Sequence, residues 1–165
     1  MSTKPILVFG YGNLSRGDDA LGMLMLEHIE ARFSLETIDL LSDFQLQIEH
    51  ALDLENRELV VFVDASVKSE TAFEFTQLQP IRDLSHTTHA MSPAAILDTY
   101  QTIKKQMPPP CFLLAIGADS FELGEDLGGK AKQNLAKASE FMETLLNNPT
   151  FDFWHKVQTK VCTPV

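Results

Sequence analysis

Residues Ile6–Gly22 read ILVFGYGNLSRGDDALG, and the expected fold is worked out from this stretch. It opens with a short all-apolar run, which is typical of a strand buried on both faces. Gly10 and Gly12 permit a sharp turn after the strand, and Asp18 and Asp19 stand where the next helix should begin. A buried strand is thus followed by a glycine turn and by two adjacent carboxylates.

The two carboxylates have a structural and a functional explanation. Asp is a favoured N-cap, and a negative charge at a helix N-terminus is stabilised by roughly 0.3–1 kcal/mol, which accounts for Asp18. A dinucleotide site is the functional alternative, because Gly10–Ser15 almost matches G-x-G-x-x-G and Asp39 lies near the end of the next expected strand. However, Ser15 replaces the third glycine, and carboxylates would stand where a pyrophosphate needs N–H groups. The stretch therefore favours a cation site, with Asp19 as a candidate ligand.

Length and charge limit the classes of protein to be considered. The chain has 165 residues, of which 44% are hydrophobic and 22% charged, as in an ordinary globular protein. We expect a single α/β domain over residues 1–148 and a C-terminal tail over 149–165 that is packed on it or mobile. The net charge of −10 argues against nucleic acid and anionic membrane surfaces as partners, because phosphate binding depends on Lys and Arg.

The two cysteines and the hydropathy pattern favour a cytoplasmic protein. Cys111 falls within an expected buried strand, and with Cys162 as the only other thiol there is no disulfide framework. No secretory signal opens the sequence, and no apolar run is long enough to span a bilayer. No helix has a surplus apolar face, so we expect a monomer.

The hydrophobic periodicity predicts strands alternating with helices. The expected strands cover residues 6–9, 36–41, 59–63, 71–78 and 111–116. The expected helices cover 19–33 and 44–54, one opening at Ser92-Pro93, and 130–146. The apolar residues expected to face inward from the helix over 44–54 are Phe44, Ile48, Ala51 and Leu52. This alternation predicts a three-layer α/β/α fold with a mostly parallel sheet.

Three residues are candidates for a site at the carboxyl ends of the strands, where such folds collect their chemistry. Asp19 follows the first strand, Asp64 ends the third, and His89 lies in the loop before Ser92. Two carboxylates and an imidazole suit a borderline cation such as zinc, nickel or manganese. Without a metal, two neighbouring carboxylates would instead support shared-proton acid–base chemistry, as in an aspartyl protease.

Each candidate also has a purely structural explanation. Asp19 is a possible second capping charge, Asp64 a possible cap of the following turn, and His89 a possible loop histidine bonded to backbone. Other catalytic patterns are absent: the sequence has no H-E-x-x-H, no G-x-S-x-G and no G-x-x-x-x-G-K-[ST]. It is therefore the three residues in combination that favour a site.

The motifs resemble those of the nickel–iron hydrogenase maturation proteases. The resemblance is carried by GYGNL with the following DDxxG, by VFVDA ending in Asp64-Ala65, by HAMSP beginning at His89, and by Ile116-Gly117 with FELG further on. These blocks occur in order from Ile6 to Leu146. Several blocks in register are a more specific signal than a lone G-x-G-N.

The resemblance implies a fold and a function. It implies an α/β fold with a twisted five-stranded sheet. It also implies a cytoplasmic endopeptidase that removes a C-terminal peptide from the hydrogenase large-subunit precursor once nickel is inserted. The family's metal-recognising residues match Asp19, Asp64 and His89, and Asp39 matches another acidic position near the cleft. The nickel would arrive with the substrate, so the free enzyme should hold little or none.

The sequence departs from the family pattern in three places. The first acidic ligand is Glu or Asp in the family and is Asp19 here. Many members have a Gly-Thr pair after the second strand, where this sequence reads Leu41-Ser42-Asp43-Phe44. The usual Gln-Pro-type segment is replaced by Ala118-Asp119-Ser120. These changes keep the three metal-recognising residues but leave open which hydrogenase is processed.

Overall fold

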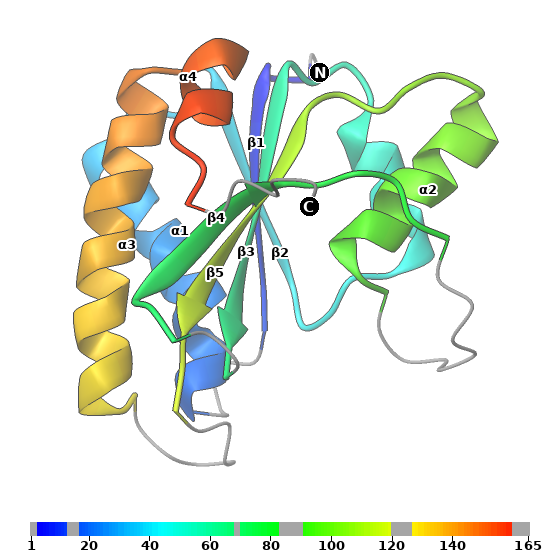
Figure 1. Ribbon diagram of the computed structural model, residues 1–165. Helices are drawn as coiled ribbons and strands as arrows, with labels where there is room; N and C mark the ends of the chain where they lie inside the picture. The colour runs from blue at the N-terminus through cyan, green and yellow to red at the C-terminus, as the bar shows by residue number, and fades with distance from the viewer. Residues whose placement is uncertain (1–2, 13–16, 68–69, 83–90, 120–126, 160–165) are drawn as a thin grey trace.

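The fold is built on one five-stranded sheet, seen in a computed structural model of the chain (Figure 1). The structure describes residues 3–12, 17–67, 70–82, 91–119 and 127–159, except the side chains of Asp18 and Asp19. The strand order is β2-β1-β3-β5-β4, and only the β4–β5 pairing is antiparallel. The strands are β1 (Ile6–Tyr11), β2 (Ile38–Asp43), β3 (Leu59–Ser66), β4 (Phe73–Gln77) and β5 (Cys111–Gly117).

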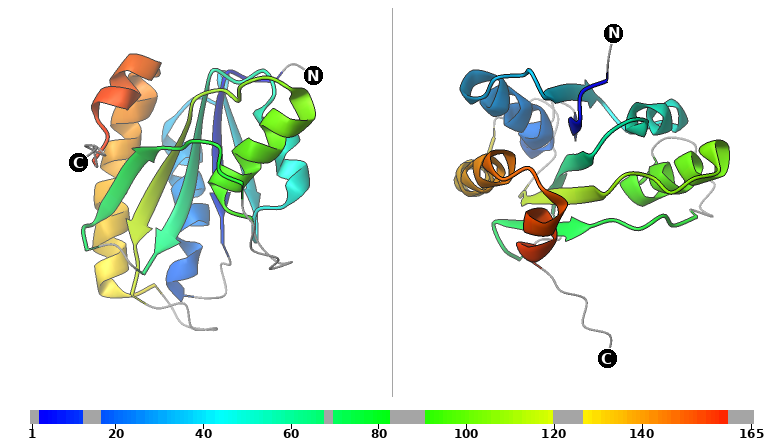
Figure 2. Two further views of the ribbon diagram at one scale, coloured as in Figure 1. Left: turned by 45° about the vertical axis from the view of Figure 1, so that its right-hand side comes forward. Right: turned by 90° about the horizontal axis from the view of Figure 1, so that it is seen from above.

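Helices cover both faces of the sheet, so the three-layer α/β/α fold expected from the sequence is confirmed (Figure 2). One face carries α1 (Leu21–Arg32), α3 (Gly129–Asn147) and α4 (Phe151–Lys156), and the other carries α2 (Pro93–Lys104). The short 3-10 helix η1 (Gly17–Ala20) leads into α1, and a second, η2 (Ile48–Leu54), packs beside α2. No helix among the described residues is both long and apolar enough to cross a membrane.

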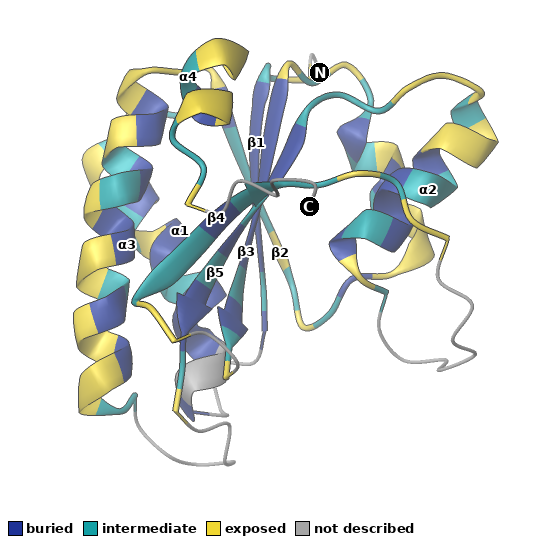
Figure 3. Ribbon diagram, viewed as in Figure 1, coloured by how far each residue is buried: buried dark blue, intermediate teal, exposed yellow. Residues whose placement is uncertain are grey.

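The core lies on the two faces of the central strands. Most residues of β1, β3 and β5 are buried and apolar, because a parallel strand between two helix layers exposes neither side to water (Figure 3). In contrast, α3 is buried along the side toward the sheet and exposed along the other (Figure 3). Its periodic pattern was therefore a sound indicator of a surface helix.

Two expected elements differ from the structure. The second strand begins at Ile38 and ends at Asp43, two residues later than expected. The expected helix over 44–54 is a shorter 3-10 helix, and Phe44, Ile48 and Leu52 are exposed rather than inward. Ala51 is buried as expected, but the other buried positions belong to Leu46 and Leu54, which the predicted helical face did not include.

The described part of the C-terminal tail packs on the domain, which is one of the two arrangements expected, through the helix α4, which was not predicted. Trp154 is fully buried, and its indole N–H donates to the Leu145 carbonyl oxygen at 2.9 Å. Its ring packs edge-on against Phe75 and Phe112 of the sheet. Thr159 extends the contact, because its backbone N–H donates to the Phe75 carbonyl oxygen at 2.9 Å.

Candidate functional site

The sheet has one point where the chain leaves neighbouring strands in opposite directions. Strand β1 pairs with β2 on one side and with β3 on the other, and all three are parallel. In open α/β sheets this reversal opens a crevice at the carboxyl ends of the strands. In Figure 1 the parallel strands point downward, so this edge is the lower one. We call it the carboxyl edge.

Asp64 lies at the carboxyl edge, next to the crevice. It directly follows Val63, which pairs with Gly10 of β1, and it pairs with Ala115 on the other side. The side chain is half-buried, and its Oδ1 accepts a hydrogen bond from the Ala65 backbone N–H at 2.8 Å. Strand β3 continues to Ser66 instead of ending at Asp64, but the carboxylate keeps the position that the sequence indicated.

The segment bearing Asp19 crosses the same crevice. Its backbone belongs to η1, which contacts β3. Three residues later, Gly22 packs so closely that a Cβ atom there would lie 2.8 Å from the Tyr11 carbonyl oxygen and 2.9 Å from that of Val63. The start of α1 therefore packs directly on the carboxyl ends of β1 and β3. Its contact on β3 is Val63, the residue before Asp64.

His89 and the side chain of Asp19 lie outside the described residues. The first described residue after the loop that contains His89 is Met91, whose backbone N–H donates to the Leu46 carbonyl oxygen at 3.1 Å. Ser92 then caps α2, its hydroxyl accepting from the Ala95 N–H at 3.1 Å, as the sequence predicted. The described geometry thus brings Asp64 and the backbone of the Asp19 segment together.

The structure does not bring Asp39 to the carboxyl edge. The expectation that it stands near the end of its strand is wrong, because it is the second residue of β2 and pairs with Leu7. It lies four positions before Asp43, the strand end, or about 13 Å away at 3.3 Å per residue. Its carboxylate pairs with Arg57 and accepts from the Lys4 backbone N–H at 3.2 Å.

The residue of β2 that does reach the carboxyl edge is Asp43. It pairs with Tyr11, and its carbonyl oxygen accepts from the Gly12 N–H at 3.1 Å. One carboxylate oxygen accepts from the Phe44 N–H at 2.7 Å, and the other lies 3.2 Å from His50 Nε2. This pair was not predicted, because the second strand was expected to end at Leu41 and not at Asp43. The sequence feature that could have indicated Asp43 is an acidic residue near the carboxyl end of a strand, which is also what indicated Asp64.

The tautomer of His50 follows from its second contact. Its Nδ1 accepts from the Gln47 backbone N–H at 2.8 Å, so the proton of the neutral ring is on Nε2 and points to Asp43. The ring also packs edge-on against Phe9, with centroids 4.8 Å apart. The pair therefore holds the start of η2 against the end of β2.

Among the described residues, no three His, Cys, Asp or Glu side chains are placed to hold a metal ion. The thiol of Cys111 is buried, and burial raises its pKa, so it is protonated and a poor nucleophile.

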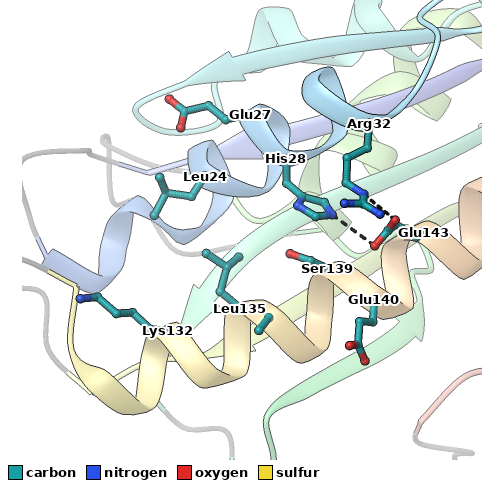
Figure 4. Close-up of a pocket in the computed structure, with 10 residues that line it drawn as sticks. Leu24, Glu27, His28, Arg32, Lys132, Leu135, Ser139, Glu140 and Glu143 are labelled. Atoms are coloured by element: carbon teal, nitrogen blue, oxygen red, sulfur yellow. Dashed lines mark hydrogen bonds and ion pairs between the residues drawn. The ribbon is translucent and has the colours of Figure 1, made fainter.

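A groove of about 710 Å³ lies elsewhere, between α1 and α3 (Figure 4). Leu24 and Leu135 form part of its wall, and His28 and Arg32 point across it toward Glu143 (Figure 4). The Arg32 Nε donates to Glu143 at 2.7 Å, and His28 Nε2 lies 3.4 Å from the same carboxylate. These contacts join two helices, and we attach no chemistry to them.

Comparison with solved structures finds the same fold in hydrogenase maturation enzymes. The hydrogenase maturating endopeptidase HybD from E. coli matches with a TM-score of 0.67 at 22% identity, covering 87% of this chain and 93% of that one. The [NiFe] hydrogenase maturation protease HycI from Thermococcus kodakarensis matches with a TM-score of 0.64 at 25% identity, covering 88% and 94%. A hydrogenase 2 maturation peptidase from a Thaumarchaeota archaeon matches with a TM-score of 0.63 at 20% identity, covering 87% and 98%.

No protein-family model matches the sequence, and a comparison with curated proteins finds no match. The shared fold over most of the chain confirms the resemblance to the hydrogenase maturation proteases. The likeness to named hydrogenase maturation proteases supports a peptidase, an enzyme that hydrolyses peptide bonds.

Proposed function

We propose that the protein removes a C-terminal peptide from the nickel-loaded precursor of a nickel–iron hydrogenase large subunit, and that it recognises the nickel held by that substrate. The observation that carries the proposal is the convergence of Asp64 and the Asp19-bearing segment on the β1/β3 crevice. Binding sites of open α/β sheets form at such a crevice. The likeness to named hydrogenase maturation proteases supplies the substrate class.

In this proposal Asp19, Asp64 and His89 fill the open positions of the substrate's nickel. Oxygen and imidazole ligands suit a borderline divalent ion. Docking through the ion holds one peptide bond at the crevice and turns a bimolecular encounter into an oriented one. A precursor without nickel lacks this anchor, so cleavage also checks that the metal is present. The free enzyme binds little metal.

Hydrolysis adds water to the carbonyl carbon of the held peptide bond, breaks the C–N bond and passes a proton to the leaving amine. Two routes to the attacking water are open: polarisation by the substrate's metal, or proton removal by a carboxylate acting as general base. Asp64 and Asp19 are the candidate bases. Asp39 has no part in either route, because it lies about 13 Å from the strand end.

We further propose that the enzyme acts as a monomer in the cytoplasm. The free thiol of Cys111, packed in β5, suits a reducing compartment.

The decisive experiment mixes the purified chain with nickel-loaded and with nickel-free precursor and measures the mass of any released peptide. Release from the nickel-loaded form alone is expected. Equal release from both forms would reject recognition through nickel. Release from neither would favour a non-catalytic chaperone of the large subunit, and stoichiometric zinc in the purified chain would favour a metallohydrolase with its own ion.

Two variants test the assigned residues. His89→Ala and Asp64→Asn should each lower nickel-dependent release at least about 100-fold, since a misplaced reacting group costs that much. Asp152→Asn, an exposed acid on α4, is the matched control and should release peptide at the wild-type rate. Circular dichroism melts check that each variant is folded. A fully active Asp64→Asn protein would remove Asp64 from the site.

A further inference from the structure

His50 contacts two parts of the chain, three and seven residues before it. Its Nδ1 accepts from the Gln47 backbone N–H at 2.8 Å, and its Nε2 lies 3.2 Å from the Asp43 carboxylate. The side chain is only 11% exposed, so the ring is held on both sides within the fold. Because the ring joins the end of β2 to the start of η2, we call Asp43, Gln47 and His50 the His50 bridge.

Capping of η2 does not by itself require a histidine. Gln47 and His50 form a capping box, in which the third helical residue accepts from the backbone N–H of the N-cap residue. Glu and Gln are the usual residues at this third position. Histidine supplies the same acceptor through Nδ1, and it adds a donor, Nε2–H, that faces Asp43. The additional contact of His50 is therefore with the carboxyl edge of the sheet.

The segment that the His50 bridge closes, residues 43–47, is bonded to the end of the loop that contains His89. The Leu46 carbonyl oxygen accepts from the Met91 backbone N–H at 3.1 Å. Met91 follows His89 by two residues in the sequence, and two residues span at most about 7 Å. Residues 43–47 therefore fix the point at which this loop rejoins the described fold, close in sequence to His89.

The same segment is bonded to the turn that leads toward Asp19. Gly12 directly follows β1, and its backbone N–H donates to the Asp43 carbonyl oxygen at 3.1 Å. Gly12 has a φ of 141°, a conformation that favours glycine, so the path of the chain at this turn is specific. Asp43 and Leu46 thus contact both of the chain segments that lead to the other candidate site residues.

We propose that His50 is a positioning residue of the carboxyl edge. In this proposal the His50 bridge fixes residues 43–47, and these hold the segments that lead to Asp19 and His89. His50 itself does not contact the substrate, because both of its ring nitrogens already have partners within the protein. The role in cleavage rests on the proposed function, because it concerns the site at which the nickel-loaded precursor would be processed.

Hydrogen exchange of the Met91 amide tests the bridge without any substrate. In His50→Ala this amide should exchange about tenfold faster than in wild type, because the segment that accepts its hydrogen bond is no longer held at both ends. Leu46 stays buried in the core, so the variant should remain folded, which circular dichroism melts check. The Phe33 amide, bonded to the Ile29 carbonyl oxygen at the end of α1, should exchange as in wild type.

Two further substitutions separate the bridge from the helix cap. His50→Gln keeps an acceptor for Gln47 and a donor for Asp43, so it should restore the wild-type exchange rate. His50→Glu keeps the acceptor of an ordinary capping box but places a second carboxylate against Asp43. At about pH 8, far above the usual range of acidic side chains, the two carboxylates repel each other, so His50→Glu should behave like His50→Ala. Wild-type exchange in His50→Glu would reduce His50 to a cap and overturn the proposal.

Cleavage of nickel-loaded precursor tests the role of the bridge in catalysis. The kcat/KM of His50→Ala and His50→Glu should fall about tenfold, because a small displacement of a reacting group lowers the rate strongly. That of His50→Gln should stay within about twofold of wild type. The matched control is His28→Ala, which removes a 3.4 Å contact between a histidine and Glu143 on the opposite face of the sheet. It should keep the wild-type kcat/KM and the wild-type exchange of the Met91 amide.

The outcomes separate the two proposals. Unchanged Met91 exchange in folded His50→Ala would overturn the positioning role of His50, whether or not the wild type cleaves the precursor. Faster exchange with an unchanged kcat/KM would also overturn that role, and would leave the proposed function standing. Faster exchange in a protein whose wild type cleaves neither form of the precursor would overturn the proposed function alone, since His50 would still position the carboxyl edge.

Discussion

Three strand carboxylates show how position decides the role of one residue type. Asp43 ends β2 and Asp64 lies two residues before the end of β3, both at the carboxyl edge, whereas Asp39 lies near the start of β2. Burial alone would raise the pKa of Asp39, but the hydrogen bond and charge of Arg57, with those of Lys4, outweigh it and lower that pKa. Asp39 is therefore a structural ion that remains charged, not a proton carrier.

Asp39→Asn should destabilise the fold in a pH-dependent way. The variant leaves Arg57, whose side chain is 7% exposed, without its anion, so unfolding at pH 7 should need about 2 kcal/mol less. The folded pKa is lowered, so the stabilisation is complete above the unfolded value of about 4 and is lost as the pH falls through the folded value. Urea titrations at about pH 7 and pH 3 measure both effects.

Glu55→Gln is the matched control for Asp39→Asn. Glu55 pairs with Lys104 at 3.0 Å but is 44% exposed, and such pairs contribute up to about 1 kcal/mol. The unfolding free energy of the Glu55→Gln variant should hardly differ from that of the wild type at either pH. Equal losses in the two variants would show that burial of Arg57 is not the cause.

At the scale of elements, the crevice depends on how closely α1 approaches the sheet. Gly10 and Gly22 face each other, and a Cβ on Gly10 would lie 2.6 Å from the Gly22 carbonyl oxygen. Glycine is needed at both positions because the neighbours are backbone atoms, which have no rotamer to move into. This packing sets the position of η1 above β3.

Gly22→Ala should therefore destabilise the fold and also disturb the geometry of the carboxyl edge. Overpacking of this kind costs about 1–3 kcal/mol. The matched control is Gly129→Ala at the start of α3, where an added Cβ meets nothing within 4 Å and Ala improves helix propensity. Thermal melts should show a loss for the first and no loss for the second. Equal melting temperatures for Gly22→Ala and wild type would contradict the close-packing argument.

At the scale of the whole molecule, the C-terminal segment closes the sheet face that α3 leaves open. Trp154 joins three elements by donating to Leu145 of α3 and packing on Phe75 of β4 and Phe112 of β5. The edge strand gains hydrogen bonds from the same segment, since the Phe75 N–H donates to Thr159 Oγ1 at 2.7 Å. Trp154 is thus part of the core, while most of the other described tail residues are exposed.

Trp154→Ala should lower the free energy of unfolding by about 3–5 kcal/mol, because it empties a fully buried indole site. Trp154→Phe keeps much of the apolar volume but leaves the Leu145 carbonyl without its donor, so it should fall between wild type and alanine. Phe151→Ala, in the same helix and 40% exposed, is the control and should cost less. Chemical denaturation ranks the four proteins.

The sequence predicted the strands, the layers and the position of Asp64 well. The apolar runs of β3 and β5 mark strands buried on both faces, and an acid that follows such a run, as Asp64 does, must lie near the carboxyl edge. The prediction failed at β2 and η2, whose short segments combine apolar and polar residues without a clear period. There the Asp43–His50 contact was missed and Asp39 was misplaced.

By itself the sequence determined which segments are buried, because burial follows from local runs and periods of apolar residues. Only the tertiary structure decided where β2 begins and ends, that η2 leaves Phe44 and Ile48 in water, and that Trp154 enters the core. Each of these depends on contacts between residues far apart in the chain. Strand register, helix type and the burial of a short terminal helix are set by the parts of the fold against which each segment packs. Those parts consist of residues distant in the sequence.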